Sequence, residues 1–275
     1  MTTVPKILVI GDAMKDLYHV GTAVRLSPEA PIPVVKITET KHSPGGAANV
    51  AANLASLGAE ALLLHGWRVW ANGKEIPQKH RLVVGTTQLA RWDEWDSVSP
   101  IPVEALQAAV ERWQPDGIVV SDYGKGSVDG KVSRWVIDQN LPTFVDTKHG
   151  PEHFAYDHPQ GFTSRWVYFP NRQEYEKDRV RYDLCPSVVL KKSEEGVEER
   201  EYGKPIIEYP TFARSVGSVC GAGDVVVAAY AFAVTSGRHN PLWFANLAAG
   251  LAVEKPGTSV VSLREIEERM KELGA

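Results

Sequence analysis

The amino-acid sequence predicts an α/β fold: a single domain over residues 1–275, with a mainly parallel sheet, helices on both of its faces and a small β lid. Short apolar, β-branched runs alternate with segments of helical periodicity, which is typical of a parallel sheet covered by helices. A polar residue follows several of these runs, at the edge where such sheets bind ligands. A proline-bearing edge strand and a hairpin, near residues 30–44 and 79–95, predict the lid. The polar residues at the strand ends are Asp12, Asp122, Asp146 and Asn171.

The first third of the chain contains a core strand, a lid strand and a helix. Residues 7–10 form an apolar run that stops at Asp12, which predicts a buried strand ending at a turn. Residues 31–40 combine prolines with polar side chains, and prolines are confined to the edges of sheets. The glycine pair at 45–46 opens a helix rich in alanine, and Gly58 is the residue expected just past its end.

The rest of the chain continues the alternation. We predict a hairpin at 82–85 and 86–92, helices at 103–113 and 131–140, and strands at 117–122, 143–146, 166–169 and 187–192. The polar run at 191–204 predicts a solvated hairpin. This order favours parallel pairing, which brings the polar strand ends together.

Composition excludes several classes of partner. A net charge of −4 and a pI near 6.1 give no basic field for nucleic acid or an anionic membrane, so a small molecule is the expected partner. Cys185 and Cys220 are far apart, which argues against a disulfide framework or a sulfur-based zinc site and favours a reducing cytoplasm. The apolar run near the N-terminus is too short for a signal peptide or a membrane span.

The strongest local motif is a glycine-rich turn, Gly221-Ala222-Gly223-Asp224, that enters a long apolar helix. Backbone N–H groups of Ala222 and Gly223, at the positive end of the helix, suit an anion such as a phosphate. Asp224 in that place is a candidate general base that takes a proton from a hydroxyl group during phosphoryl transfer. The alternative is a plain N-cap aspartate with no chemical role.

Several motifs, in this order and spacing, resemble the PfkB/ribokinase-like family of carbohydrate kinases. Within that family they are most similar to the D-glycero-D-manno-heptose 7-phosphate kinases, the kinase half of bacterial ADP-heptose synthases. The resemblance runs from Ile7 to about Ser262 and implies a ribokinase-like fold. The motifs are GDAMKDLY (11–18), RLSPEAPIPVVK (25–36), PGGAANVAANLASLGA (44–59), SDYGKG (121–126), PNRQEYE (170–176), GAGD (221–224) and FANLAAGLAVEKPGTSVVS (244–262).

The resemblance implies transfer of the γ-phosphate of ATP to the C1 hydroxyl of heptose 7-phosphate, with Asp224 as the base. The nucleotidyltransferase half has no counterpart, so coupling to ADP transfer is not expected. Two different functions stay open: a kinase for another sugar or a nucleoside, and a non-catalytic protein that binds nucleotide or sugar. A homodimer through the lid is a further expectation from the family, and the edge strand is compatible with it.

The family motifs also imply roles for individual residues. Residues expected around the acceptor sugar or its phosphate are Asp16, Gly45, Gly46, Asn49, Lys79, Asp122 and Lys125. Residues expected around ATP are Lys148, Asn171, Lys191, Asn246, Gly250, Gly257 and Ser259. Asn171 and Glu174 match an element that helps to hold Mg²⁺ through water, and they also have the spacing of a capping box. The alternatives are turn formation for Asp16, surface solvation for Lys79, and tight helix packing for Asn246 and Gly250.

The chain also departs from the family pattern. Ser218-Val219-Cys220 stands where an Asp-x-Thr sequence is usual, Lys191 replaces a common threonine, and DTKH (146–149) replaces DPKG. A strand and helix segment between Leu64 and Lys79 is shortened. These changes predict weakened or redirected activity before complete loss, because Asp224 remains. The sequence leaves open whether a monovalent cation binds near residues 218–224.

Overall fold

The computed structural model describes residues 4–70, 73–94, 96–154 and 165–274. Its main sheet has eight strands in the order β14-β13-β12-β11-β10-β9-β1-β4. Neighbours from β4 to β12 are parallel, and β13 and β14 add antiparallel strands at one edge. The strands are β1 (Lys6–Gly11), β4 (Glu60–His65), β9 (Gly117–Asp122), β10 (Thr143–Thr147), β11 (Trp166–Tyr168), β12 (Ser187–Lys191), β13 (Val197–Glu201) and β14 (Ile207–Tyr209).

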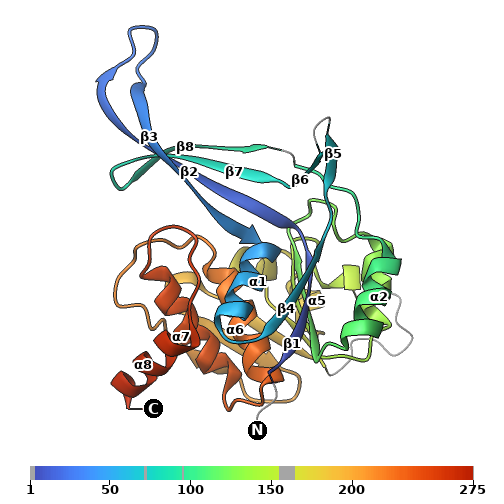
Figure 1. Cartoon of the computed structure of the whole chain (residues 1–275). Coiled ribbons are helices and arrows are strands. Elements are labelled where there is room, and N and C mark those ends of the chain that lie inside the picture. The colour runs from blue at the N-terminus through green and yellow to red at the C-terminus, as the bar shows by residue number, and fades with distance from the viewer. Residues whose placement is uncertain (1–3, 71–72, 95, 155–164, 275) are drawn as a thin grey trace.

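Helices cover both faces of this sheet, as the sequence predicts (Figure 1). One apolar core joins one face to α1 (Ala47–Ser56), α6 (Ala222–Thr235), α7 (Pro241–Val253) and α8 (Leu263–Leu273). The other core joins the opposite face to α2 (Val103–Trp113), α3 (Gly130–Ile137), α4 (Arg172–Lys177) and α5 (Arg179–Tyr182). Short 3₁₀ turns occupy Pro151–Phe154 and Ser193–Glu195.

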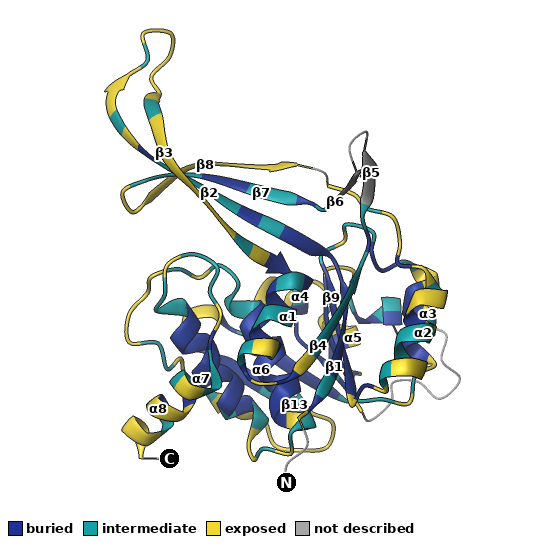
Figure 2. Cartoon of the chain, in the orientation of Figure 1, coloured by how far each residue is buried: buried dark blue, intermediate teal, exposed yellow. Residues whose placement is uncertain are grey.

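Strand β1 shows how one apolar run serves both cores. Ile7 and Val9 belong to the core beneath α1 and α6, whereas Leu8 and Ile10 belong to the core beneath α2 and α3. Successive side chains of a strand point to opposite faces, so a strand covered on both sides is apolar throughout. The dark strands of the body in Figure 2 show this burial.

The lid is a separate four-stranded sheet in the order β3-β2-β7-β8. Strands β2 (Ala13–Leu26) and β3 (Pro33–Gly46) form a long antiparallel hairpin that projects from the body, and β7 (Gln78–Val84) pairs with β2 in parallel and with β8 (Thr87–Glu94) antiparallel. The predicted edge strand and hairpin are confirmed as β3 and β7–β8. Strand β2 was not predicted, although it is the lid's longest connection to the body.

The shortened segment between Leu64 and Lys79 forms a small antiparallel hairpin. Its strands are β5 (Arg68–Trp70) and β6 (Gly73–Glu75), and residues 71–72 lie outside the described part of the chain. Strand β4 runs into this hairpin, and the chain then enters β7 of the lid. A short hairpin therefore stands where the family pattern led us to expect a longer strand and helix segment.

The polar run at 191–204 is only partly the solvated hairpin that we predicted. Strands β12 and β13 do pair antiparallel, but β14 covers the far edge of β13. Lys192 and Glu198 are buried there and form an ion pair over 3.3 Å. Among the described helices, none is both long and apolar enough to cross a membrane.

Candidate active site

Asp224 lies in the first turn of α6, where the glycine-rich turn enters the helix. Gly221 is the N-cap residue and adopts the left-handed conformation with φ 78°, so Asp224 is the third residue of the helix. A Cβ atom at position 221 would stand 2.7 Å from Nδ2 of Asn49, so glycine is required there. The interpretation of Asp224 as a plain N-cap residue is therefore wrong. Its carboxylate is available for other contacts.

The carboxylate of Asp224 is buried and held at both oxygens. Oη of Tyr123 donates a hydrogen bond to Oδ1 over 2.6 Å, and Nδ2 of Asn49 donates to Oδ2 over 2.9 Å. Burial raises the pKa of Asp224 from 3.8 to about 6, although these two hydrogen bonds lower it. Asp146 nearby raises the pKa and Lys191 lowers it. A carboxyl group with a pKa close to neutrality is well matched to proton transfer.

Asn49 was expected near the sugar, and the structure shows its amide supporting Asp224. Oδ1 of Asn49 accepts a hydrogen bond from Nδ2 of Asn53 over 3.0 Å, and Oδ1 of Asn53 accepts from the backbone N–H of Val261 over 3.1 Å. Both asparagines are fully buried. This row of amides connects the segment after α7 to Asp224. A contact from Asn49 to a sugar hydroxyl stays a prediction.

Asp16, the second predicted acid, lies on β2 where the lid meets the body. Nη1 of Arg81 donates to its Oδ1 over 2.9 Å, and Oγ1 of Thr258 donates to its Oδ2 over 2.9 Å. Asp16 and Arg81 are both buried. Oη of Tyr18 also lies 3.1 Å from Oγ1 of Thr258. Asp16 therefore joins the two lid strands β2 and β7 to the loop that follows α7, and it is not a simple turn residue.

The glycine pair before α1 makes room for the side chains around it. A Cβ atom at Gly45 would stand 3.0 Å from Oδ2 of Asp16, and one at Gly46 would stand 2.5 Å from the carbonyl oxygen of Asp12. Gly46 also has φ 56°, which favours glycine. The pair therefore lets the end of β3 pass close to Asp16 and to the end of β1.

Lys191 reaches from the end of β12 toward the start of α6. Its Nζ forms an ion pair with Oδ2 of Asp146 over 2.6 Å, and both side chains are largely buried. A Cβ atom at Gly223 would stand 3.5 Å from this Nζ. The ammonium group thus lies beside the backbone amides of the first turn of α6. A phosphate bound there would meet a lysine and a helix start together.

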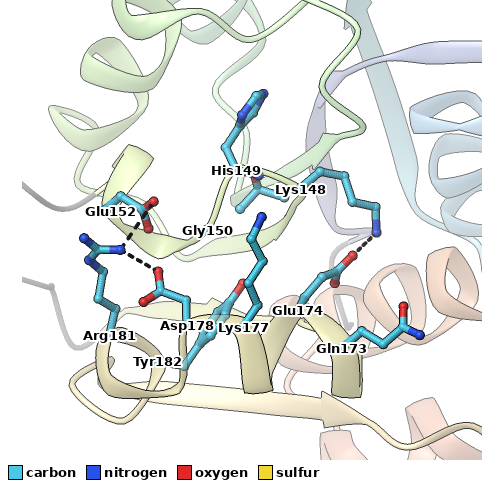
Figure 3. Close-up of a pocket in the computed structure, with 11 residues that line it drawn as sticks. Lys148, His149, Gly150, Glu152, Gln173, Glu174, Lys177, Asp178, Arg181 and Tyr182 are labelled. Carbon is cyan, nitrogen blue, oxygen red and sulfur yellow. Dashed lines mark hydrogen bonds and ion pairs between the residues drawn. The ribbon is translucent and has the colours of Figure 1, made fainter.

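Two further lysines lie around the ring of Tyr123. Nζ of Lys79 is 4.9 Å and Nζ of Lys148 is 5.4 Å from the ring centroid. Lys148 also forms an ion pair with Glu174, which Figure 3 shows at the mouth of a pocket of about 340 Å³. The pocket extends from Lys148 toward α4 and α5, where Lys177 points into it. Lys148 therefore connects this pocket to the surroundings of Asp224.

Asn171 and Glu174 form the capping box that begins α4. Oδ1 of Asn171 accepts from the backbone N–H of Glu174, and Oε2 of Glu174 accepts from that of Asn171, each over 2.9 Å. Among the described residues, no group of three or more acidic, histidine or cysteine side chains could enclose a metal ion directly. Oδ1 of Asp146 is buried and has no hydrogen-bond partner among them, so it can accept from water. This oxygen-rich set fits a largely hydrated Mg²⁺.

Asp122 and Lys125 were expected near the acceptor, and the structure gives their polar groups local partners. Asp122 is buried and accepts from the backbone N–H of Gly124 and from Oγ1 of Thr147. Lys125 forms an ion pair with Asp96. Asp122 therefore connects the ends of β9 and β10, and a direct contact with substrate stays a prediction for both residues.

The residues expected around the adenine base have packing roles. Asn246 is buried and donates to the carbonyl oxygen of Pro210 over 2.7 Å. A Cβ atom at Gly250 would stand 2.9 Å from the backbone nitrogen of Ala213, so Gly250 lets this loop pack on α7. Gly257 faces the ring of Tyr18, and Oγ of Ser259 donates to the carbonyl oxygen of Pro256. These contacts agree with tight packing, and a contact of these residues with ATP stays a prediction.

Sequence reasoning missed several residues that complete the site. Tyr123 lies inside the SDYGKG motif, but nothing in one sequence shows that its hydroxyl reaches a carboxylate 101 positions away. Arg81 had a usable signal, since residues two apart on a strand share a face and Lys79 was already a candidate. The other missed partners are Asn53, Asp146 and Thr258.

Comparison with known proteins supports one family. No family model matches the chain. The bifunctional protein HldE of Chromohalobacter salexigens is 34% identical over 307 residues, and that of Yersinia pestis is 33% identical over 310. The matches cover 95% and 96% of this chain but only 62% and 63% of those proteins, so the chain spans less than two thirds of their length. Both alignments are longer than the 275-residue chain, so these relatives carry additional residues within them.

Solved structures show the same fold at low identity. The ribokinase of Arabidopsis thaliana complexed with ribose and ATP has a TM-score of 0.75 at 16% identity, covering 98% of this chain and 99% of that one. Phosphofructokinase-2 of Escherichia coli in complex with substrates and products has a TM-score of 0.73 at 16% identity, covering 99% and 100%. With the sequence match to HldE and the order of the motifs, these findings show that the chain belongs to the PfkB/ribokinase-like family.

Proposed function

We propose that this chain is an ATP-dependent carbohydrate kinase that phosphorylates the C1 hydroxyl of heptose 7-phosphate. The observation that carries the proposal is the buried carboxylate of Asp224, held by Tyr123 and Asn49 in the first turn of α6. The heptose substrate rests on the resemblance of the motifs to heptose 7-phosphate kinases. The fold shared with a ribokinase bound to ribose and ATP supports the reaction class.

The proposed reaction is a direct transfer. The acceptor's hydroxyl oxygen forms a bond to the γ-phosphorus, and the bond from that phosphorus to the bridging oxygen of ADP breaks. The hydroxyl proton passes to Asp224, and ADP leaves with the electron pair of the broken bond. A carboxylate has about four acceptor positions, and two of those on Asp224 are used by Tyr123 and Asn49. The remaining positions are free to accept the substrate hydroxyl.

Charge on the transferring group is proposed to be stabilised by the start of α6 and by Lys191. Backbone N–H groups of Ala222 and Gly223 lie at the positive end of the helix, and the ammonium of Lys191 lies beside Gly223. Glu174 and Asn171 would hold Mg²⁺ largely through water, and the ion would neutralise charge on the ATP phosphates.

A phosphorylated acceptor fits the charges beneath the lid better than a neutral sugar. A hydrogen bond from Arg91 lowers the pKa of Asp93, and Lys79 and Lys125 lower it further, so three cations surround one lid carboxylate. Arg81 adds a fourth cation at Asp16. An anionic substrate group would gain from this excess of positive charge.

The direct test is ADP release by the purified chain with a panel of acceptors: heptose 7-phosphate, the unphosphorylated heptose, ribose, fructose 6-phosphate and a nucleoside. We expect the highest kcat/KM for heptose 7-phosphate. A clear preference for another acceptor would replace the substrate and keep the reaction class. Calorimetric binding of ATP or sugar without any turnover would favour a non-catalytic binding protein.

The pKa of Asp224 sets the expected pH dependence. The carboxylate must be ionised to accept a proton, and its pKa is raised to about 6. We therefore expect kcat/KM to be low below pH 5, to rise through a limb near pH 6 and to level off above pH 7. A profile measured from pH 5 to 9 in one buffer series of constant ionic strength checks this. A flat profile down to pH 5 would exclude Asp224 as the titrating base.

Substitution of Lys191 is expected to weaken ATP binding. Lys191→Met removes the ammonium beside the anion-binding turn, and we expect the KM for ATP to rise about tenfold, as for loss of one charged hydrogen bond. The matched control is Lys192→Met, because Lys192 is the next residue and pairs with Glu198 and Glu208 instead. An equal rise in KM for both variants would show a general loss of structure at the end of β12.

We also propose that two copies associate through the lid. Strands β3 and β8 are its open edges, and large apolar side chains on the lid are exposed. These side chains are Val24, Leu26, Ile37, Leu89 and Trp92. Sedimentation velocity that reports a monomer at micromolar concentration would contradict this association.

A further inference from the structure

Tyr123 has a position that the proposed reaction does not by itself explain. Its hydroxyl donates to Oδ1 of Asp224 over 2.6 Å, and its backbone N–H donates to Oδ2 of Asp12 over 2.8 Å. The same carboxylate of Asp12 accepts from the backbone N–H groups of Lys125 and Ser127. The turn after β9 is therefore fixed by Asp12, and the phenol extends from a rigid support to the candidate base.

We propose that Tyr123 is a positioning residue for phosphoryl transfer, whose hydroxyl fixes the carboxylate of Asp224 and keeps it ionised. This inference rests on the proposed function. The two oxygens of Asp224 have separate donors from different elements, Tyr123 after β9 and Asn49 on α1. Two such contacts fix both the plane and the rotation of the carboxylate, which a single contact does not.

Tyr123 can act only as a donor in this contact. Burial raises the pKa of its phenol well above the ordinary value, and the carboxylates of Asp224 and Asp146 raise it further. The phenol therefore keeps its proton at any pH at which the protein would work. A hydrogen bond to the charged form of a carboxyl group favours that form, so loss of the hydroxyl should raise the pKa of Asp224.

Other charged groups also act on Asp224, so the contribution of Tyr123 must be separated from theirs. They come from several elements that meet at the site: Asp146 on β10, Lys148 just after it, Lys191 on β12, Lys79 on β7 and, near Tyr123, Asp16 on β2. Tyr123→Phe keeps the ring that Lys79 and Lys148 approach and removes only the oxygen atom. The variant therefore isolates the hydrogen bond.

The test measures the pKa of Asp224 in the parent and in Tyr123→Phe by NMR of ¹³C-labelled aspartate carboxyl groups, with Asp224→Asn to assign the signal. We expect the pKa to rise by about one pH unit, as for loss of one hydrogen bond to a charged group. The acid limb of kcat/KM should move up by the same amount. At pH 6 the variant should be several-fold slower than the parent, by up to about tenfold, and this difference should shrink toward pH 9.

Tyr230→Phe is the matched control, because Tyr230 lies on the same helix as Asp224 and its buried hydroxyl donates to a different carboxylate, that of Glu199. It should leave both the pKa of Asp224 and the limb unchanged. An unmoved pKa in Tyr123→Phe, or an equal shift in Tyr230→Phe, would overturn the proposal. So would a loss of rate with an unmoved limb, since a purely structural role would give that result. The NMR titration needs no turnover, so it still decides the role of Tyr123 if no acceptor is phosphorylated.

Discussion

Asp224→Asn is expected to lower kcat for phosphoryl transfer by roughly 10³-fold, the largest effect of any single substitution in this chain. The asparagine amide has nearly the same shape as the carboxylate but cannot take the proton of the acceptor hydroxyl. The KM for ATP should change little, because the amides of the α6 turn and Lys191 remain in place. Steady-state ADP release with saturating heptose 7-phosphate at pH 8 measures the loss.

The same substitution should not destabilise the fold, which separates lost chemistry from lost structure. The pKa of the folded carboxyl, about 6, lies above the ordinary value of 3.8, so ionisation of this buried group opposes folding. Its stabilising contribution is complete below pH 4 and is lost as the pH rises through 6. At pH 8 the neutral Asp224→Asn variant should therefore be the more stable protein, by up to about 3 kcal/mol in denaturant unfolding. Turnover within tenfold of the parent would remove Asp224 from the mechanism.

The main sheet could be predicted from sequence because its strands are buried on both faces. Such strands are continuous apolar runs, and those at residues 7–10 and 117–122 became β1 and β9. Strand β2 could not be found this way, since it lies in the lid, has a mixed pattern of exposure, and gains its partners from β3 and β7. Helix α8 was missed although Ser262 and Glu265 form a capping box that the sequence shows.

The candidate site was predictable as far as motifs locate single residues. Asp224 and Asp16 could be selected because they stand at a helix start and in a matched segment. Their partners could not, because Tyr123 and Arg81 come from other elements and only the folded chain brings them within hydrogen-bond distance. The contacts of Asn49 with Asp224 and Asn53 could not be foreseen for the same reason, although Asn49 itself was selected as a sugar ligand.

Arg81→Met is expected to have the second largest effect, through the lid. The ion pair of Arg81 and Asp16 is buried, with side chains 9% and 7% exposed. Removing the guanidinium leaves the charge of Asp16 buried with only the hydroxyl of Thr258 as partner. Loss of one member of a buried pair costs roughly 3 to 5 kcal/mol. We expect a loss of this size in the free energy of unfolding, measured by urea denaturation, and a matching loss of acceptor binding.

The double variant Arg81→Met/Asp16→Asn distinguishes a buried ion pair from simple loss of packing. With both charges gone, no unpaired charge remains, so its free energy of unfolding should recover most of what Arg81→Met alone loses. Acceptor binding should stay low in the double variant, because Asp16 is proposed to bind the sugar. Arg91→Met is the matched control, since Arg91 pairs with Asp93 on β8, where the strand is exposed. Additive losses in the double variant would mean that Arg81 acts by packing on Tyr18 rather than by neutralising Asp16.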